Sequence, residues 1–558
     1  MNSKINLNIR ILFYSVWFVG LLLQAYFTEL TSDEAYYWMY SNNLAWGYFD
    51  HPPVIAFIIK LGYSIFPNEL GVRLLPVIFS TLTLFVLEKI VKPKEIKPFI
   101  MLVSSVGILH IIGFFAIPDA PFIFLSTVYL YLYQKFTINK NIKNAIFLGI
   151  SIALMCLSKY HGLIIIGLSV LSNLKLLSNR YFWLVTIISI LLLVPHFLWQ
   201  LNANFPSINY HLFERSTEAY KFTYSLEYLI SQLVVLGPIT GIIFFIAAIK
   251  EKTNNQFEKT LKFLFWGGYI FFFIMSFKGR VEAHWTLYIV LPALYFGYNY
   301  LIKLKNTMRV LNITFLISIT LIILFRLLII PNLMLDNIPM IARLTKDFRN
   351  KNTMLAIKNI AKDYPVAFMN SYQNASLYSF YSKSDGFSLN NIMGRKNQFD
   401  LWNVEDKYRG QSIILIPNYY VEEFAKVPGI SEDIRFTRID NFQSFSKIRI
   451  SAVKIEKEAD VSTDMNVKVI LTSTDNNINL DANSDYPSYI YYQFFDGKDL
   501  VKEDSAIRIN NDMLNKEILL NIKMPDTRGV YGLFFSIKTG WLPPSINSKR
   551  YKMSVVDN

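Results

Sequence analysis

TSDEAYYWMYSNNLAWGYFDHPP, residues 31–53, follows the first long apolar run of the chain and fixes where that run ends. It carries Asp33-Glu34 near its start and Asp50-His51 before a Pro-Pro pair. Its tyrosines and tryptophans are typical of a membrane–water interface. Acids beside lipid are costly to keep unless they are used, so the stretch predicts a functional loop at a membrane surface. A solvated loop with an aromatic belt is the simpler alternative.

The composition indicates a polytopic α-helical membrane protein. The chain has 558 residues, of which 53% are hydrophobic and 16% aromatic, with a mean hydropathy of +0.31. Only 17% are charged, below the roughly 25% of soluble domains. Several apolar runs reach the ~20 residues that span a bilayer. The first run lacks a small-residue cleavage site, so we expect a retained helix and not a signal peptide.

The net charge of +14 does not predict a nucleic-acid partner. Lysines and arginines gather in short loops between the apolar runs, which is the pattern of the positive-inside rule. The single cysteine, Cys156, lies in an apolar run. A disulfide framework and a cysteine metal site are therefore excluded.

Periodicity and length predict about eleven membrane spans. With the N-terminus in the cytoplasm, every even-numbered span returns to a basic loop there. The odd count then places the C-terminal region on the outer face, together with His51, His161, His211 and His284. The predicted spans are 11–30, 72–91, 99–117, 120–134, 145–158, 162–174, 181–199, 229–249, 263–277, 285–302 and 310–332.

The domain organisation follows from a change in composition near residue 332, after which long apolar runs stop. Residues 1–332 are predicted to form a membrane domain with an outer loop at 31–71. Mixed helix and strand patterns predict an α/β domain at 333–450. Alternating apolar residues with turn signals predict a β-sandwich-like domain at 451–558.

Two acidic positions are candidates for catalysis. Asp33 and Glu34 are adjacent, so on a helix they cannot point the same way. One carboxylate is therefore free to serve as general base for a hydroxyl nucleophile. The alternative is an N-terminal acid pair on a helix over 34–41 with Ser32 as N-cap. Asp119, in the short outer turn Pro-Asp-Ala-Pro, is a second acid that solubility alone does not explain.

Asp50-His51 and several cations predict an anion or metal site on the same face. Asp and His together ligate a divalent metal or hold a phosphate, although a turn with a solvated charge pair is the simpler alternative. Cations at one interface suit a phosphate, and each alone is also explained as a snorkelling residue. These cations are Arg73, Lys159, Arg215, Lys278 and Arg280. No P-loop or Rossmann fingerprint is present, so a cytoplasmic nucleotide site is not supported.

Seven motifs together resemble a family of bacterial membrane glycosyltransferases, the relatives of protein O-mannosyltransferases and of aminoarabinose transferases that act on lipid A. The resemblance covers about 1–330 and is weaker in the C-terminal motifs SYQNASLYSFY and FDLW. It implies a GT-C fold whose first outer loop carries juxtamembrane helices. It also implies inverting transfer of a sugar from a polyprenyl (undecaprenyl) phosphate. The motifs, in chain order, are DEAYYW, LAWGYFDHPP, GVRLLP, IPDAP, LSKYHGL, LGPIT and KGRVEAHW.

The resemblance also implies roles for single residues. Asp33 resembles the catalytic carboxylate, Glu34 its partner and Asp119 the second acid. Asp50 resembles a metal ligand, with His211 of YHLFER as a second ligand for Zn, Mg or Mn. The donor phosphate would be held by His51, Arg73, Lys159, Arg215, Lys278 and Arg280. The lipid A branch has lysine where this chain has His51, which replaces that lysine only when protonated.

The predicted function is transfer of a sugar to an envelope acceptor, with lipid A favoured. A protein O-glycosyltransferase or glycan-decorating transferase is the alternative within the enzyme class. A transporter of lipid-linked sugar would carry its charges at mid-bilayer depth, and a non-catalytic scaffold would not need the outer acids. The expected location is the bacterial inner membrane, with multiple spans and a periplasmic active site and C-terminal region.

Overall fold

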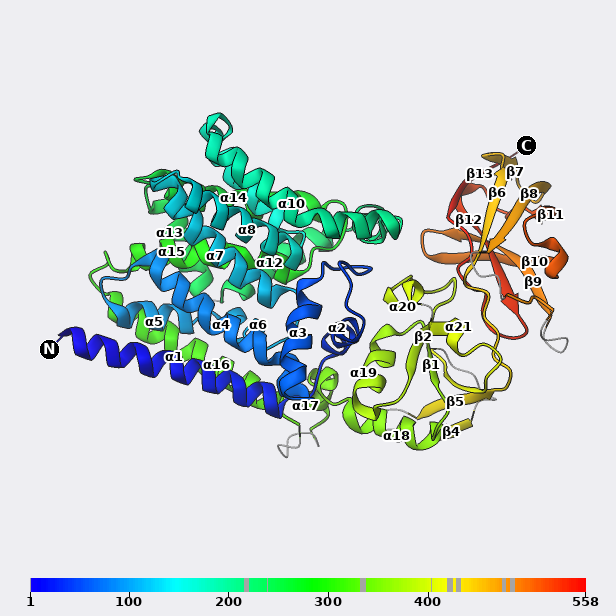
Figure 1. Cartoon of the computed structure of the whole chain (residues 1–558), viewed down its shortest axis with the longest axis horizontal. Coiled ribbons are helices and arrows are strands. Elements are labelled where there is room, and N and C mark those ends of the chain that lie inside the picture. Colours follow the sequence, from blue (N-terminus) through cyan, green and yellow to red (C-terminus); the bar gives the residue numbers. More distant parts are fainter. Residues whose placement is uncertain are drawn as a thin grey trace. The chain divides into compact units, whose positions relative to one another are not determined.

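The computed structural model forms two compact units, Met1–Asn350 and Lys351–Asn558 (Figure 1). The division lies after the predicted domain boundary at 332. The residues it describes are 2–214, 220–237, 239–331, 338–402, 404–418, 425–427, 433–473, 478–481 and 487–557.

The N-terminal unit is built from packed helices (Figure 1). Its core is apolar and contiguous, and runs from Trp17 in the first helix to Leu311 and Ile329 in the last long one. The helices are α1 (Asn2–Phe27), α2 (Ser32–Asn42), α3 (Val54–Ile65), α4 (Glu69–Val91), α5 (Ile96–Ser104), α6 (Gly107–Ile112), α7 (Asp119–Ile138), α8 (Ile142–Ser158), α9 (Gly162–Ser172), η1 (Leu174–Ser178), α10 (Arg180–Asn202), α11 (Pro206–Asn209), η2 (Tyr210–Glu214), α12 (Phe222–Leu236), α13 (Thr240–Lys250), α14 (Gln256–Ser276), η3 (Ala283–Ile289), α15 (Val290–Leu301), α16 (Thr307–Leu328), α17 (Pro339–Leu344) and η4 (Lys346–Phe348).

Within the described residues, four helices are long and apolar enough to cross a membrane: Asn6–Phe27, Glu69–Val91, Arg180–Asn202 and Thr307–Leu328. Shorter apolar helices accompany them at α3, α8, α9 and α13. The exposed faces of α10 and α16 are apolar, which suits contact with lipid tails. These features fit a multi-pass helical membrane part. The number of about eleven spans stays a prediction.

Several predicted spans are broken in the structure. The run 99–117 divides into α5 and α6 at Ser105, which caps α5. The run 229–249 divides into α12 and α13 at Gly237, whose φ of +95° is open to glycine but strained for other residues. The run 285–302 starts as the 3₁₀ segment η3 before α15 begins. Hydropathy does not detect such breaks, because the residues on both sides are apolar.

The predicted outer loop 31–71 folds into α2 and α3, as the resemblance implies. The N-cap of α2 is Thr31 and not Ser32. Thr31 accepts from the Glu34 backbone N–H, and Glu34 Oε2 accepts from the Thr31 backbone N–H at 3.0 Å. This reciprocal capping box requires a spacing of three residues, which Thr31 has and Ser32 lacks.

Polar side chains join α1 and α16 near their C-terminal ends. Arg326 Nε donates to Gln24 Oε1 at 3.0 Å, and Arg326 also donates to the Gly20 carbonyl. Gln24 Nε2 returns a hydrogen bond to the Arg326 carbonyl at 3.1 Å. The arginine therefore has partners within the protein, as an ionised group among apolar helices requires.

The C-terminal unit starts with an α/β part. Its mixed sheet has the order β2-β1-β3-β5-β4. β1 is parallel to β2 and β3, and β5 is antiparallel to β3 and β4. The elements are α18 (Lys351–Ala361), β1 (Val366–Met369), α19 (Tyr372–Ser382), β2 (Gly386–Leu389), α20 (Gln398–Leu401), α21 (Val404–Lys407), β3 (Ile413–Ile416), β4 (Ala425–Val427) and β5 (Ile434–Ile439).

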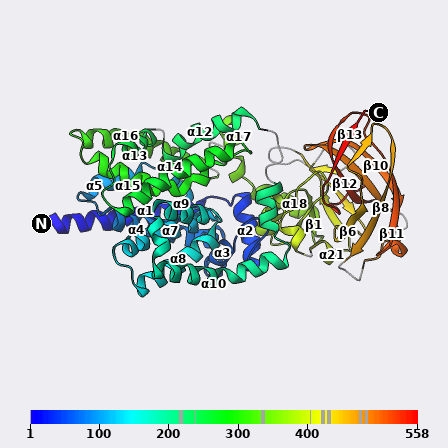
Figure 2. The same cartoon turned by 90° about the horizontal axis from the view of Figure 1, so that it is seen from above.

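Two further sheets follow, with orders β10-β9-β12-β13-β7 and β11-β8-β6 (Figure 2). Buried and exposed residues alternate along β8 and β11, because one face of that sheet is turned to the core. The predicted domain boundary at 450/451 falls inside β6. The elements are β6 (Ile448–Lys454), β7 (Glu458–Asp460), β8 (Asp464–Ser473), β9 (Ser488–Asp496), β10 (Asp499–Arg508), η5 (Asn511–Met513), β11 (Glu517–Lys523), β12 (Gly529–Thr539) and β13 (Tyr551–Val556).

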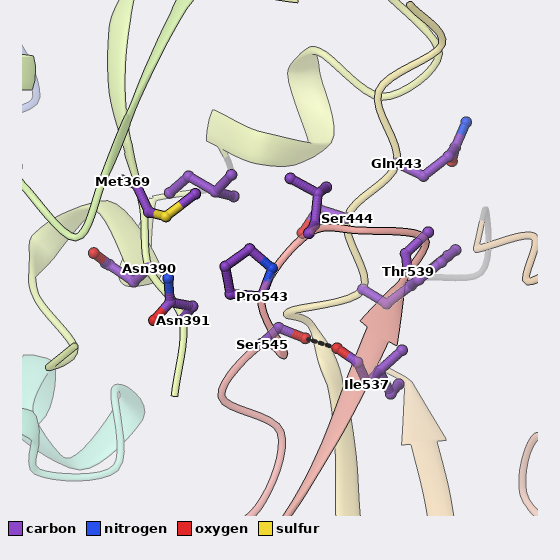
Figure 3. Close-up of a pocket in the computed structure, with 12 residues that line it drawn as sticks. Met369, Asn390, Asn391, Gln443, Ser444, Ile537, Thr539, Pro543 and Ser545 are labelled. Carbon is purple, nitrogen blue, oxygen red and sulfur yellow. Dashed lines mark hydrogen bonds between the residues drawn. The ribbon is translucent and has the colours of Figure 1, made fainter. Parts of the chain in front are cut away.

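A crevice lies between the α/β part and the two following sheets (Figure 3). Met369 and Asn390, at the carboxyl ends of β1 and β2, line one side of it. Ile537, Thr539 and Pro543, from β12 and the turn after it, line the other. None of the predicted site residues belongs to this lining.

Candidate functional site

The adjacent acids at the start of α2 have opposite environments. Asp33 is exposed, whereas Glu34 is fully buried. Arg73 holds both oxygens of Glu34, with Nε 2.7 Å from Oε1 and Nη2 2.6 Å from Oε2. The Ala116 backbone N–H also donates to Oε1, at 2.9 Å. Glu34 is thus occupied by protein groups, and Asp33 is the acid that faces outward.

The remaining N–H groups of Arg73 donate to backbone carbonyls. Nη1 donates to Ala25 at 3.2 Å and to Thr28 at 2.6 Å, and Nη2 donates to Glu29 at 2.8 Å. The side chain is fully buried. All five guanidinium N–H groups are therefore directed at protein acceptors. This geometry does not fit the predicted role of Arg73 in binding the donor phosphate, and it makes Arg73 the anchor of α2.

Asp119 opens α7 and is buried in an ion pair with Lys159. Lys159 Nζ lies 2.7 Å from Asp119 Oδ1, and His284 Nε2 lies 4.0 Å from Asp119 Oδ2. Burial by itself would raise the pKa of Asp119, but the charges of Lys159 and His284 and the hydrogen bond from Lys159 together outweigh burial and hold this pKa below its usual value. Asp119 is therefore ionised at neutral pH.

The structure places Glu34 against the segment that leads to Asp119. Ala116, which binds Glu34, is three residues before Asp119. His51, from the end of the first loop, is electrostatically coupled to both Asp119 and Lys159. Segments far apart in sequence thus meet around the Asp119–Lys159 pair.

His51 is not a cation at neutral pH. Burial lowers its pKa to about 4, because the charged ring loses solvation. The Asp50 carboxylate opposes this effect, and His211 and Lys159 add to it. Neutral His51 offers a phosphate one N–H donor but no positive charge, so the predicted charge-based role does not hold in this structure.

Asp50 and His211 are neighbours, but the described residues gather no set of metal ligands around them. Tyr40 donates its hydroxyl hydrogen to Asp50 Oδ1 at 2.6 Å. His211 Nε2 lies 2.9 Å from the Asp50 carbonyl oxygen, which leaves that nitrogen to act as a donor. In the part of the chain that the structure describes, no three His, Cys, Asp or Glu side chains gather as metal ligands. Two candidate ligands do not fit the usual coordination of Zn, Mg or Mn.

The remaining predicted cations are exposed or lie outside the described residues. Arg280 Nε is 3.3 Å from Glu227 Oε2, and both side chains are more than half exposed. Lys278 is exposed beside it. Arg215 lies outside the described residues. Lys278 and Arg280 therefore remain accessible to an anion, but the structure does not tie them to the Asp119–Lys159 pair.

His161 and His284, to which the sequence prediction gives no role, lie with His51 in a cluster around the Asp119–Lys159 pair. The ring of His161 packs on Phe272 and Trp285, each with a centroid distance of 5.5 Å. Burial, with the nearby charge of Lys159, lowers the pKa of His161 well below its usual value. His284 approaches Asp119 directly. His161 lies in the motif LSKYHGL and His284 in the motif KGRVEAHW. Their place in these motifs is the feature of the sequence that could have indicated a role in the site.

Parts of the chain are similar to known proteins. Residues 50–199 match the family described as dolichyl-phosphate-mannose-protein mannosyltransferase. The lipid A galacturonosyltransferase RgtD of Rhizobium johnstonii is 24% identical over 272 residues. That match covers 46% of this chain and 56% of the relative, so it spans little more than half of the relative's length.

The fold resembles that of ArnT from Cupriavidus metallidurans. The apo structure of ArnT gives a TM-score of 0.57 at 13% identity, covering 76% of this chain and 97% of ArnT. The structure of ArnT bound to undecaprenyl phosphate gives 0.54 at 11% identity, with the same coverage. At these identities the likeness to ArnT shows the fold alone. The chain has a multi-pass helical membrane part and a C-terminal sheet-rich domain.

The region that matches the family model contains several residues of the candidate site. Asp50, His51, Asp119 and Lys159 lie within it. The acid pair that opens α2 lies before its first residue, and His211 and His284 lie after its last. The site is thus assembled from segments on both sides of the matched region.

Proposed function

We propose that the chain moves a sugar from a polyprenyl phosphate carrier to an envelope acceptor, with lipid A as the favoured acceptor. The observation that carries the proposal is the buried Asp119–Lys159 pair, with His284 beside it and Glu34 of α2 bound to the same segment through Ala116. An ionised acid, a cation and an outward acid are the groups that a displacement at an anomeric carbon requires. The names of RgtD and of undecaprenyl-phosphate-bound ArnT support this acceptor and this donor.

The proposed reaction is a single displacement that inverts the anomeric centre. An oxygen of the acceptor attacks the anomeric carbon, and the bond from that carbon to the phosphate oxygen breaks. The electron pair leaves with the polyprenyl phosphate. Asp33 takes the proton of an acceptor hydroxyl. If the acceptor is a phosphate of lipid A, it is already anionic and Asp33 orients it instead.

The other residues have supporting parts in this proposal. Lys159 faces the charge that grows on the leaving phosphate, and neutral His51 donates one hydrogen bond to it. Lys278 and Arg280 are accessible cations for the same phosphate. Glu34 and Arg73 hold α2 in place without touching a substrate. No step needs a metal.

The proposed location is the bacterial inner membrane. The short basic loops would lie in the cytoplasm, as the positive-inside rule requires. The site and the C-terminal unit would then face the periplasm. The polyprenyl tail would lie against the apolar helix faces.

A protein O-glycosyltransferase is the second candidate. It is favoured by the family match, whose description names a protein mannosyltransferase. Mass spectrometry of lipid A, surface glycans and glycoproteins, from cells with and without the gene, separates the two. A sugar missing from lipid A supports the first candidate, and a sugar missing from glycoproteins supports the second. Unchanged products in all three classes would count against both.

A further inference from the structure

Gln200, near the end of α10, is the centre of a branched hydrogen-bond network beside the first outer loop. Its side chain is buried. Nε2 donates to the Tyr160 hydroxyl at 2.9 Å and to Ser207 Oγ at 2.7 Å. Both amide hydrogens are therefore in use.

Each branch ends at a backbone carbonyl of the loop. Ser207 Oγ donates to the Tyr48 carbonyl at 2.8 Å. His196 Nδ1 lies 2.6 Å from the Trp46 carbonyl, and its Nε2 lies 3.2 Å from the Tyr160 hydroxyl. A carbonyl only accepts, so Nδ1 carries the hydrogen, and Nε2 of the neutral ring accepts from Tyr160.

Matching donors to acceptors in this network also determines the orientation of the Gln200 amide. With Nε2 toward Tyr160 and Ser207, each hydroxyl accepts one hydrogen bond from Gln200. The Tyr160 hydroxyl then donates to His196 Nε2, and the Ser207 hydroxyl donates to the Tyr48 carbonyl. A flipped amide would attract both hydroxyl hydrogens, and the Tyr48 carbonyl and His196 Nε2 would lose their donors. The observed orientation leaves only Gln200 Oε1 without a partner. An apolar side chain would avoid that buried oxygen, so the two donors explain why an amide stands here.

The two carbonyls belong to the segment that leads to Asp50 and His51. His211 Nε2 adds a third contact, to the Asp50 carbonyl at 2.9 Å. Residues 46, 48 and 50 are thus each held through their carbonyl oxygen by the segment 196–211. Within the loop, the Tyr48 N–H donates to the His51 carbonyl at 3.0 Å and closes the turn.

We propose that Gln200 is a positioning residue that sets the backbone of 46–50 and, through it, the places of Asp50 and His51. It acts through Tyr160 and His196 on one branch and through Ser207 on the other, and it does not touch the reacting atoms. The functional part rests on the proposed function, in which His51 faces the phosphate of the donor. Buried hydrogen bonds in such networks reinforce one another, so loss of the shared donor loosens both carbonyls.

Three variants of the full-length protein separate the branches. Gln200→Met keeps the size of the side chain and removes both donors. Tyr160→Phe breaks only the branch to Trp46, and Ser207→Ala breaks only the branch to Tyr48. Gln24→Met is the matched control, because Gln24 is also a buried, hydrogen-bonded glutamine but lies in α1 beside Arg326.

The first measurement is amide hydrogen exchange of peptides covering 43–53. We expect faster exchange in Gln200→Met, a smaller increase in each single-branch variant and none in Gln24→Met. Unchanged exchange in a folded Gln200→Met would overturn the proposal. If that variant does not fold, Tyr160→Phe and Ser207→Ala decide in the same way.

The second measurement is binding of undecaprenyl phosphate to the purified protein by native mass spectrometry. We expect Gln200→Met to bind about tenfold more weakly at an unchanged melting temperature, a separation that a purely stabilising residue would not give. Equal affinity would overturn the positioning role. If the unaltered protein does not bind this lipid, the proposed function fails instead, and hydrogen exchange still decides whether Gln200 fixes the loop.

Discussion

Asp33 is the residue whose charge we expect transfer to need. It is exposed at the first turn of α2, while the buried Glu34 is committed to Arg73. Asp33→Asn keeps the shape and removes the base, so transfer from a polyprenyl phosphate sugar should fall by about a hundredfold or more. The measurement is product formation in membranes that contain equal amounts of inserted protein.

Glu69→Gln is the control for Asp33→Asn. Glu69 is also an acid in the first turn of a helix, α4, and belongs to the same outer region. Among the described residues, no hydrogen bond or ion pair joins Glu69 to Asp33, Asp119 or Lys159, so the activity of Glu69→Gln should stay near that of the unaltered chain. Normal turnover by Asp33→Asn would remove Asp33 from the mechanism.

His51 should make the fold sensitive to acid. Burial lowers its pKa from the usual 6.5 to about 4, so between these values the unfolded chain binds a proton that the folded chain does not. Protonation therefore favours unfolding, and stability falls as the pH falls through this window. Between about pH 7 and about pH 5, the melting temperature of the unaltered protein should drop more than that of His51→Gln.

The comparison with His51→Gln leaves a residual effect. Burial also lowers the pKa of His161, so the variant keeps part of the acid sensitivity. Equal drops in melting temperature for the two proteins would mean that His51 does not titrate in this way. The prediction is therefore that the unaltered protein shows the larger drop in melting temperature, and it sets no size for the difference from His51→Gln.

At the scale of elements, Arg73 joins three helices. From α4 it reaches Glu34 in α2 and the carbonyls of Ala25, Thr28 and Glu29 at the end of α1. Arg73→Met leaves the Glu34 carboxylate buried without its counter-charge. Such a loss lowers the free energy of unfolding by about 3–5 kcal/mol. Thermal unfolding in detergent, followed by intrinsic fluorescence, measures it.

The double variant Arg73→Met/Glu34→Met tests the cause. Replacing both charges with apolar groups removes the unpaired carboxylate, so much of the lost stability should return. The carbonyls at the end of α1 still lack their donors, so recovery should be incomplete. A double variant that is less stable than Arg73→Met would contradict this account.

The sequence predicts the helical membrane part, but it does not predict the breaks in the helices or the pairing of charged side chains. Apolar runs and basic loops reveal the helical membrane part, because lipid restricts composition over whole spans. The breaks at Ser105 and Gly237 depend on local backbone geometry within apolar sequence. The Glu34–Arg73 pair spans 39 positions, and no local pattern distinguishes it from a phosphate site. The sequence indicates Asp119 and Lys159 as separate charged candidates. It does not predict that they form an ion pair, because the two residues meet only in the folded chain.

At the scale of the whole molecule, the chain has separate apolar cores in its two units. One core includes residues from α1 to α16, and another is formed by the strands after Phe445. The composition change near 332 detects the end of lipid-facing helices. It does not detect where the second unit starts, at Lys351, because that limit depends on which residues pack together.

The C-terminal unit should therefore fold when expressed alone as residues 351–558, with a cooperative thermal transition in circular dichroism. The fragment 451–558 should not, because it cuts β6 and removes Ile448 and Ile450 from the core. It also removes the Phe445 and Ile448 carbonyls that accept from Asn547 Nδ2, each at 2.8 Å. A fragment that begins at residue 444 restores these groups and should show the cooperative transition that 451–558 lacks. A non-cooperative transition in 351–558 would show that this unit depends on the helical one.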